Sequence, residues 1–340
     1  MRTYDVGIFG IGWVAGEHIK AYMQNPNMKV VALASRKRQS AQAKKEELGL
    51  DCDILDSYES LLERDDIDII DLCSPNFLHA EEAISAAQKH KHVVIEKPIA
   101  MNLKELKKVM NAVVKAGVKS QVGFISRWNS HIQSIRSMID KGGLGDIFYV
   151  EVDYYHEIGP WWSGWNWGAN TRKNGPSASL VAGCHAVDLL YYFGGDVEEV
   201  FAYGTFGHRK DYEYEPTYAA VVKFKDGKIG KTGCSFENEC PYVMNIIIHG
   251  SKGAVLNEKF YTKEWYPGQQ GWQNFSAIFL DSGDVVHHPF KEMVDDLAEA
   301  LINDKQASAN INEAYKSHEI CLAIDQSIET GQIVKLPLAE

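Results

Sequence analysis

The sequence predicts an α/β protein in two parts: a doubly wound parallel sheet, followed by an α+β domain with a large, open, mostly antiparallel sheet. Two observations predict this class. Apolar strand-like runs alternate with helical stretches through residue 124, which favours a parallel sheet covered on both faces. From residue 125 the strand-like runs follow one another with one helix among them, as in α+β domains. We therefore expect domains at 1–124 and 125–340.

The first domain is expected to contain five strands and four helices. The strands are predicted at 4–9, 30–34, 67–73, 93–95 and 119–124, and the helices at 13–23, 39–48, 79–89 and 103–115. Each strand is short and apolar, as expected for strands that are buried on both faces.

The second domain begins with a predicted helix at 132–140, which ends before the Gly142-Gly143 pair because glycine readily adopts the left-handed conformation of a helix C-terminus. Asp226-Gly227 is a hairpin signal between two strands. Strands are predicted at 147–155, 199–203, 218–224, 229–236 and 243–249, with a helix at 178–193. Helices at 290–302 and 312–330 close the chain, and we expect them to pack back on the first domain.

Composition restricts the classes of partner. The 340 residues are 45% hydrophobic and 24% charged, which is ordinary for a globular protein. A net charge of -11 argues against a nucleic-acid partner. The six cysteines are scattered, the N-terminus lacks a signal-like apolar stretch, and no apolar run reaches the ~20 residues of a membrane helix. We expect a cytoplasmic protein without a membrane partner.

A glycine pattern follows the first strand directly. Gly10-Ile11-Gly12-Trp13-Val14-Ala15 reads as GxGxxA at the start of a helix. Gly10 permits a tight turn, Gly12 lets a pyrophosphate approach the backbone, and Ala15 lets the helix pack close to the sheet. The strand–turn–helix context supports a dinucleotide site over a purely structural glycine turn.

The end of the second strand bears on the choice of cofactor. NAD sites usually carry an acidic residue there, whereas this chain has Ser35-Arg36-Lys37-Arg38. Guanidinium groups bind phosphate through paired hydrogen bonds, so this run favours the 2′-phosphate of NADP. NAD remains the alternative cofactor, and a solvated basic helix start is the alternative interpretation of the run.

Two further segments end strands of the same sheet. Ser74-Pro75-Asn76 follows the third predicted strand, with His79 in the next turn, and Glu96-Lys97-Pro98 follows the fourth. Ligands of doubly wound sheets lie outside the carboxyl ends of the strands, so both segments are expected beside the glycine turn. The Lys97–Pro98 bond is of the type that can be cis.

A histidine and an aspartate share a face of the helix that interrupts the second domain. His185 and Asp188 are three residues apart. Oxidation of an alcohol needs a base for the hydroxyl proton and a positive group near the developing alkoxide. His185 fits the first role and Lys97 the second, while Asp188 is suited to orient the imidazole or bind a hydroxyl. Taken singly, each residue is also compatible with a structural role.

Taken in order, these motifs resemble the Gfo/Idh/MocA oxidoreductases, the family of glucose–fructose oxidoreductase and inositol dehydrogenase. The resemblance spans nearly the whole chain and includes Gln121-Val122-Gly123-Phe124 and Arg127. It implies a Rossmann domain, a C-terminal open sheet, a dehydrogenase acting on sugars, glycosides or polyols, and catalysis by Lys97 and His185. One departure stands out, since many members have Asp four residues before the catalytic histidine and this chain has Val181.

A tryptophan-rich segment precedes the helix of His185. Residues 161–167 hold four of the eight tryptophans, and indole rings offer an apolar platform for a sugar. A packed loop or a subunit contact is the equally weighted alternative. The residues assigned to the substrate are Arg127, His156, Trp165, Arg172 and Asp188. Those assigned to the cofactor are Gly10, Ile11, Gly12, Trp13, Val14, Ser35, Arg36, Arg38, Ser74, Pro75, Asn76, His79, Glu96 and Lys97.

Two other functions stay open. A glycosidase that uses bound NAD in transient oxidation and elimination would have the same motifs, as would a cofactor-binding regulator without catalysis. No metal is expected, because His287-His288 and Cys184-His185 lack convergent spacing. The resemblance also implies a homodimer or homotetramer.

Overall fold

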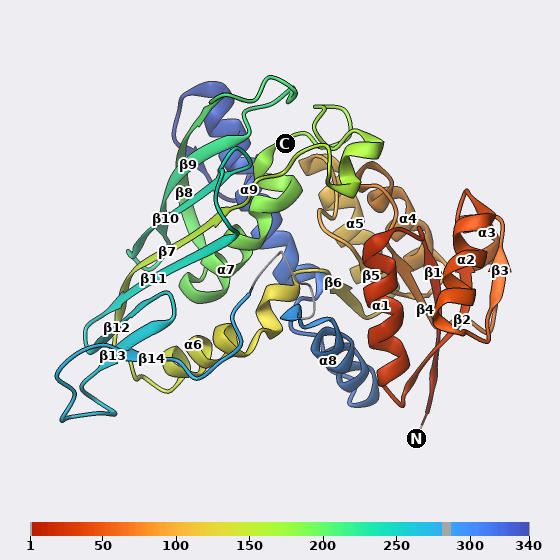
Figure 1. Cartoon of the computed structure of the whole chain (residues 1–340), viewed down its shortest axis with the longest axis horizontal. Helices are drawn as coiled ribbons and strands as arrows, with labels where there is room; N and C mark the ends of the chain where they lie inside the picture. The colour runs from red at the N-terminus through yellow and green to blue at the C-terminus, as the bar shows by residue number, and fades with distance from the viewer. Residues whose placement is uncertain (1, 281–286, 340) are drawn as a thin grey trace. The chain divides into compact units, whose positions relative to one another are not determined.

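The computed structural model describes residues 2–280 and 287–339. The chain divides into two compact units, each assembled from two stretches. Met1–Phe124 and Pro289–Tyr315 form the first unit, and Ile125–His288 and Lys316–Glu340 form the second. In Figure 1 the first unit therefore combines the elements coloured from red to yellow-brown with the blue helix α8 (Phe290–Ile302).

The first unit contains a six-stranded, wholly parallel sheet of order β3-β2-β1-β4-β5-β6. The order reverses between β1 and β4, which is where doubly wound sheets bind ligands. The strands are β1 (Tyr4–Phe9), β2 (Met28–Ala34), β3 (Asp53–Leu55), β4 (Ile69–Leu72), β5 (His92–Ile95) and β6 (Ser120–Val122). The predicted doubly wound sheet is confirmed.

Helices join these strands. They are α1 (Trp13–Gln24), α2 (Arg38–Leu48), α3 (Tyr58–Leu62), α4 (His79–Gln88) and α5 (Leu103–Ala116), with α8 from the later stretch. The pattern of burial explains the packing: α5 turns Leu106, Val109 and Val113 inward at helical spacing. Helix α4 packs beside α5, and α1 packs beside α8.

The second unit contains a nine-stranded sheet of order β14-β13-β12-β11-β7-β10-β9-β8-β15. Only the β7–β10 pair is parallel among the pairs of the described residues, so the predicted mostly antiparallel sheet is confirmed. Gly227, with φ of 92°, makes the predicted hairpin between β9 and β10. The strands are β7 (Ile147–Tyr155), β8 (Val197–Thr205), β9 (Thr217–Phe224), β10 (Ile229–Ser235), β11 (Val243–Gly250), β12 (Gly253–Leu256), β13 (Lys259–Thr262), β14 (Gln273–Asn274) and β15 (Val334–Lys335).

Three helices complete this part of the chain: α6 (Ser130–Asp140), α7 (Cys184–Gly194) and α9 (Ile311–Thr330). The single helix predicted at 178–193 is wrong in detail, because a π-helical turn at Ser179–Gly183 comes before α7. The sequence reading also missed β3, α3 and the short strands β12 to β15, which are too brief to show a periodic pattern. Within the described residues, no helix is both long and apolar enough to cross a bilayer.

Candidate active site

The glycine turn between β1 and α1 is shaped by backbone contacts. Gly10 has φ of 90°, and a Cβ there would lie 2.5 Å from the carbonyl carbon of Cys73 and from the nitrogen of Ser74. Only glycine fits this position. Ala15 is fully buried, as expected for the residue at which helix and sheet approach each other.

The start of α1 is open, in contrast to the turn before it. Gly12 is the N-cap residue, and no side chain caps the helix. Beyond its chain neighbours, no described heavy atom lies within 4 Å of the place a Gly12 Cβ would occupy. Uncapped N–H groups beside free space suit an anionic phosphate, so the residues present fit a dinucleotide. Ile11, Trp13 and Val14 complete this first turn, and Trp13 is largely exposed.

The residues of the basic run after β2 differ in their contacts: among the residues that the structure describes, some are paired within the chain and Arg36 is not. The guanidinium of Arg38 pairs with Asp56, with Nη1 and Oδ1 2.6 Å apart. The hydroxyl of Ser35 accepts a hydrogen bond from the backbone nitrogen of Lys37 at 3.2 Å. Arg36 is exposed and forms no ion pair within the described part of the chain. Arg36 is therefore the guanidinium of this run that is available to an added phosphate.

The loops after β4 and β5 are tied together by His79. Its Nδ1 lies 2.7 Å from the carbonyl oxygen of Pro98 and its Nε2 lies 2.8 Å from that of Ser74. The ring is buried, and burial lowers the pKa of His79. These contacts favour a role in shaping the loops over direct contact with a cofactor. Pro75 and the buried Asn76 lie in the same turn.

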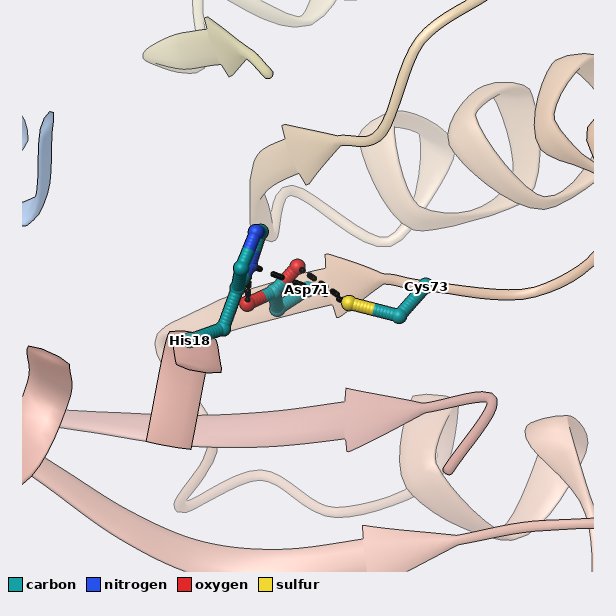
Figure 2. Close-up of side chains that lie close together, drawn as sticks. All are labelled: His18, Asp71 and Cys73. Atoms are coloured by element: carbon teal, nitrogen blue, oxygen red, sulfur yellow. Dashed lines mark hydrogen bonds and ion pairs between the residues drawn. The ribbon is translucent and has the colours of Figure 1, made fainter. Parts of the chain in front are cut away.

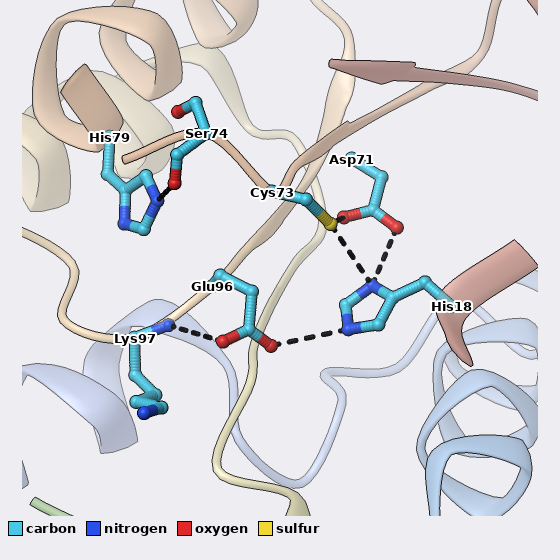
Figure 3. A network of polar contacts seen from close by, with 7 residues as sticks. All are labelled: His18, Asp71, Cys73, Ser74, His79, Glu96 and Lys97. Atoms are coloured by element: carbon cyan, nitrogen blue, oxygen red, sulfur yellow. Dashed lines mark hydrogen bonds and ion pairs between the residues drawn. The ribbon is translucent and has the colours of Figure 1, made fainter. Parts of the chain in front are cut away.

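Lys97 and Glu96 stand at the end of β5, and the Lys97–Pro98 peptide bond is cis. Figure 3 shows that the backbone nitrogen of Lys97 faces Glu96 while the lysine side chain extends away from that carboxylate. The other Glu96 oxygen, Oε1, lies 3.2 Å from Nε2 of His18 on α1.

His18, Asp71 and Cys73 form a buried cluster behind this edge (Figure 2). The side-chain atoms that could bind a metal ion (a His18 ring nitrogen, an Asp71 carboxylate oxygen and Cys73 Sγ) lie within 4.8 Å of one another, a spacing that also occurs in metal sites. Here the atoms contact each other: Nδ1 of His18 lies 2.8 Å from Asp71 Oδ2, and the Cys73 thiol donates to Asp71 Oδ1 at 3.5 Å.

In the second unit, His185 at the start of α7 faces an aromatic group on β7. Its ring stacks with that of Tyr154, with 6.3 Å between centroids and 26° between planes. The Tyr154 hydroxyl lies 3.1 Å from Nδ1 of His156. The rings of Trp161 and Tyr242 lie 5.5 and 5.6 Å from that of His156. Tyr154, His156, Trp161 and Tyr242 are hereafter the aromatic wall.

Arg127 and Asp188, both assigned to the substrate from sequence, lie together as an internal ion pair. The Arg127 guanidinium donates from Nε and Nη2 to the two carboxylate oxygens of Asp188, at 2.7 and 2.6 Å. Each residue is 1% exposed, and the hydroxyl of Ser317 also donates to Asp188 at 2.7 Å. Both carboxylate oxygens of Asp188 therefore already accept hydrogen bonds, which favours a structural role for the pair. The Asp188 carboxylate bonds Arg127 and Ser317 rather than the His185 ring.

Trp165 and Arg172 also make contacts of their own. Trp165 packs edge-on against Tyr212, with 5.3 Å between the ring centroids. Nη2 of Arg172 lies 3.1 Å from Glu215 Oε2, and its backbone nitrogen donates to Glu213. Tyr154 contacts both His156 and His185, so His156 lies in the surroundings of His185. Trp165 and Arg172 instead take part in the packing of their own loop.

A hydrogen bond to α9 anchors the turn that leads into α7. The Ser179 hydroxyl donates to Asp325 Oδ1 at 2.7 Å. Val181 is buried in this π-helical turn. It occupies the position, four residues before His185, at which the resemblance implies aspartate in many members of the family. Burial raises the pKa of Asp325 to about 7.

Two family models match this chain. Residues 4–124 match the oxidoreductase family model with an NAD-binding Rossmann fold, and residues 132–256 match the C-terminal domain model of the same family. The chain belongs to the Gfo/Idh/MocA oxidoreductase family. The predicted family, the Rossmann domain and the oxidoreductase class are therefore confirmed.

Relatives and solved structures of the Gfo/Idh/MocA family cover most of the chain. The D-glucoside 3-dehydrogenase of Escherichia coli is 26% identical, covering 97% of each chain. The myo-inositol 2-dehydrogenase of Thermotoga maritima is also 26% identical, covering 74% of each. A structure of levoglucosan dehydrogenase with NADH and L-sorbose superposes with a TM-score of 0.86 at 20% identity, over the full length of both chains. That last similarity concerns the fold.

The sequence reading of this family member missed His18, Asp71 and Cys73. A signal was present, since His18 shares the inward face of α1 with Ala15, Ile19 and Tyr22. Asp71 interrupts an otherwise apolar strand, and a carboxylate in such a place needs a partner.

Proposed function

We propose that the chain transfers hydride between NADP and a secondary hydroxyl or ketone of a sugar, glycoside or polyol, with Lys97 and His185 as the catalytic residues. The observation that carries the proposal is the position of Lys97. It follows β5 in the same parallel sheet whose β1 leads into the open glycine turn. Both segments end strands at one edge of the sheet, where ligands of this fold bind.

The roles follow from ordinary alcohol chemistry. The glycine turn and the N-terminus of α1 would hold the dinucleotide, whose nicotinamide would supply the hydride acceptor for oxidation of the hydroxyl-bearing carbon. The imidazole of His185 takes the hydroxyl proton, and the Lys97 ammonium stabilises the negative charge that develops on the oxygen. In the reverse direction His185 returns the proton to the ketone oxygen. With Asp188 committed to Arg127, we propose that the ring of Tyr154 orients His185 in place of a carboxylate.

The substrate class rests on the aromatic wall and on the relatives. Trp161 is 59% exposed next to His156, so an indole face is available to the C–H face of a sugar ring. The named relatives include dehydrogenases of D-glucosides and of myo-inositol. Of the substrate residues predicted from sequence, we retain His156 as the best supported contact.

Arg36 supports NADP as the preferred cofactor. Its exposed guanidinium follows β2, where NAD-specific sites place an acidic side chain, and no acid stands between Ser35 and Arg38. NAD is the alternative, and the family model that matches residues 4–124 describes an NAD-binding Rossmann fold.

We also propose a cytoplasmic homo-oligomer that associates through the outer face of the nine-stranded sheet. Tyr203, Val221 and Ile229 lie on that face by strand register, and each is more than half exposed. Exposed apolar side chains grouped on one face are typical of association surfaces. Light scattering of wild type and of Val221→Glu tests this point, and a monomeric wild type would contradict it.

Two single variants test the catalytic proposal. Lys97→Ala and His185→Ala should each lower kcat by at least about 1,000-fold on a sugar or polyol that the wild type oxidises, while NADPH affinity stays within a few fold. The readouts are NAD(P)H absorbance across a panel of polyols, sugars, glycosides and their keto forms, and NADPH fluorescence titration. Retained turnover in either variant removes that residue from the mechanism.

The same screen separates the alternative functions. Net hydrolysis of a glycoside, with cofactor that copurifies and no NAD(P)H accumulation, would identify the oxidation–elimination glycosidase. Cofactor binding with no turnover on the whole panel would identify the regulator.

A further inference from the structure

A single imidazole joins helix α1 to the ends of two strands. In Figure 3, His18 reaches Asp71 on β4 with Nδ1 and Glu96 after β5 with Nε2, at 2.8 and 3.2 Å. Its side chain is fully buried, and the ring of Phe290 on α8 covers it at 5.4 Å between centroids.

The two contacts favour a charged ring. Ionised carboxylates only accept hydrogen bonds, and a neutral imidazole has one N–H to donate. An imidazole that donates to two ionised carboxylates carries both protons, and the cation in turn offsets two buried negative charges that would be costly alone. Tyr22 and Cys73 face Asp71, and Lys97 and His79 face Glu96, so these are the other titratable groups around the bridge.

The electrostatics agree with this assignment. Burial is the largest single influence and lowers the pKa of His18, but the charges and hydrogen bonds of Asp71 and Cys73 together outweigh it, and the pKa rises well above its ordinary value. Burial raises the pKa of Glu96, yet the hydrogen bond and charge of His18 lower it overall.

Glu96 packs against the backbone of Gly123. A Cβ on Gly123 would lie 2.3 Å from Glu96 Oε1, so the carboxylate rests against the bare backbone of that glycine. Its other oxygen, Oε2, accepts the backbone N–H of Lys97 at 3.2 Å. One carboxylate is thus held by His18 on one side and holds Lys97 on the other.

We propose that His18 is a positioning residue for Lys97: its imidazolium fixes the ionised Glu96, which in turn fixes the backbone from which the Lys97 side chain projects. This rests on the proposed function of Lys97. Because α1 begins at the glycine turn, the bridge also sets the nucleotide-binding helix and Lys97 in one register. Small misplacement of a catalytic group costs about 100-fold in rate, so the effect should appear in kcat.

The test compares His18→Gln and Asp71→Asn with Lys20→Gln, a control on the exposed face of the same helix. His18→Gln should lower kcat by about 10- to 100-fold while NADPH affinity stays within about 3-fold. In Asp71→Asn, His18 keeps one carboxylate partner, Glu96, so its pKa falls toward the ordinary value of about 6.5. The kcat of that variant should then decline as pH rises past that value, a step that wild type and Lys20→Gln lack.

Nuclear magnetic resonance supplies a readout that needs no substrate, and its first measurement uses the wild type alone. Long-range ¹⁵N–¹H spectra of wild type should show His18 protonated on both nitrogens from pH 6 to 8.5. In Asp71→Asn the amide resonance of Lys97 should titrate together with His18. A neutral His18 in wild type overturns the proposal even if the variants fail to fold.

Two kinetic outcomes also overturn it: wild-type kcat and pH profile in His18→Gln, or a folded variant that loses NADPH affinity as much as kcat. The proposed function is tested separately by Lys97→Ala. If that variant retains turnover, the function assigned to Lys97 fails, whatever the protonation state of His18.

Discussion

Arg36 is the side chain on which the proposed choice of cofactor depends. Its guanidinium is exposed after β2, whereas the neighbouring Arg38 is paired with Asp56. Arg36→Ala should weaken NADP binding by about 10- to 100-fold, the usual worth of a hydrogen bond to a charged group, and leave NAD binding nearly unchanged. Fluorescence titration with NADPH and NADH measures both. Lys29→Ala, at the other end of β2, is the control, and an equal loss for both cofactors would contradict the phosphate contact.

Asp325 offers a test of the support beneath α7. Burial raises its pKa to about 7, so the folded chain binds this proton more tightly than the unfolded chain. The free energy of unfolding should therefore fall as pH rises from about 4 to 7, by up to about 4 kcal/mol from this group.

Asp325→Asn removes that titration but keeps an oxygen for the Ser179 hydroxyl. Urea unfolding at pH 5, 6, 7 and 8 should show a flatter dependence on pH in this variant, and greater stability than wild type at pH 8. Asp51→Asn, at an exposed position, should behave as wild type. An unchanged slope in Asp325→Asn would show that Asp325 is ionised in the folded chain throughout this range.

At the scale of elements, the turn between β1 and α1 makes opposite demands on its two glycines. Gly10→Ala places a Cβ against the backbone of Cys73 and Ser74 at positive φ, so it should destabilise the fold by several kcal/mol. Gly12→Ala meets open space and should change stability by less than about 1 kcal/mol. Its methyl group would occupy the place proposed for the pyrophosphate, so nucleotide affinity should fall at least about 10-fold.

Thermal unfolding and NADPH titration of the two glycine variants separate these effects. Unchanged affinity in a stable Gly12→Ala would place the phosphates elsewhere.

Elements with a clear apolar period were predictable to within a few residues. The predicted limits of β1 and β7 match the observed ones, because aromatic and β-branched residues predominate in both and a glycine lies near one end of each. The π-helical turn before α7 was not foreseen. The Ser179 hydroxyl of this turn donates to Asp325, which lies 146 residues later in the chain, and local sequence does not reveal such a contact.

For the whole molecule, the sequence predicts at which edge of the parallel sheet the site lies, but not which side chains pair with one another. Ligands of this fold bind at the carboxyl ends of the strands. That rule alone predicts that Gly10, Ser74 and Lys97 lie at one edge of the sheet, and it needs no knowledge of their side-chain contacts. The pairing of Arg127 with Asp188, and the bridge through His18, join residues that are 61 and 53 or more positions apart. Residue type and local spacing carry no information about such pairs, so both residues of the first pair were assigned to the substrate.

We propose that Lys97 and His185 act on one hydroxyl beside one nicotinamide. A crystal structure of the wild-type chain with NADPH tests it most directly. We expect the phosphates at Gly12 and the N-terminus of α1. Lys97 Nζ and a ring nitrogen of His185 should both lie within hydrogen-bond reach, about 2.6 to 3.2 Å, of one site beside the nicotinamide. A nicotinamide ring bound away from Lys97, or a lysine and an imidazole that face separate cavities, would contradict it.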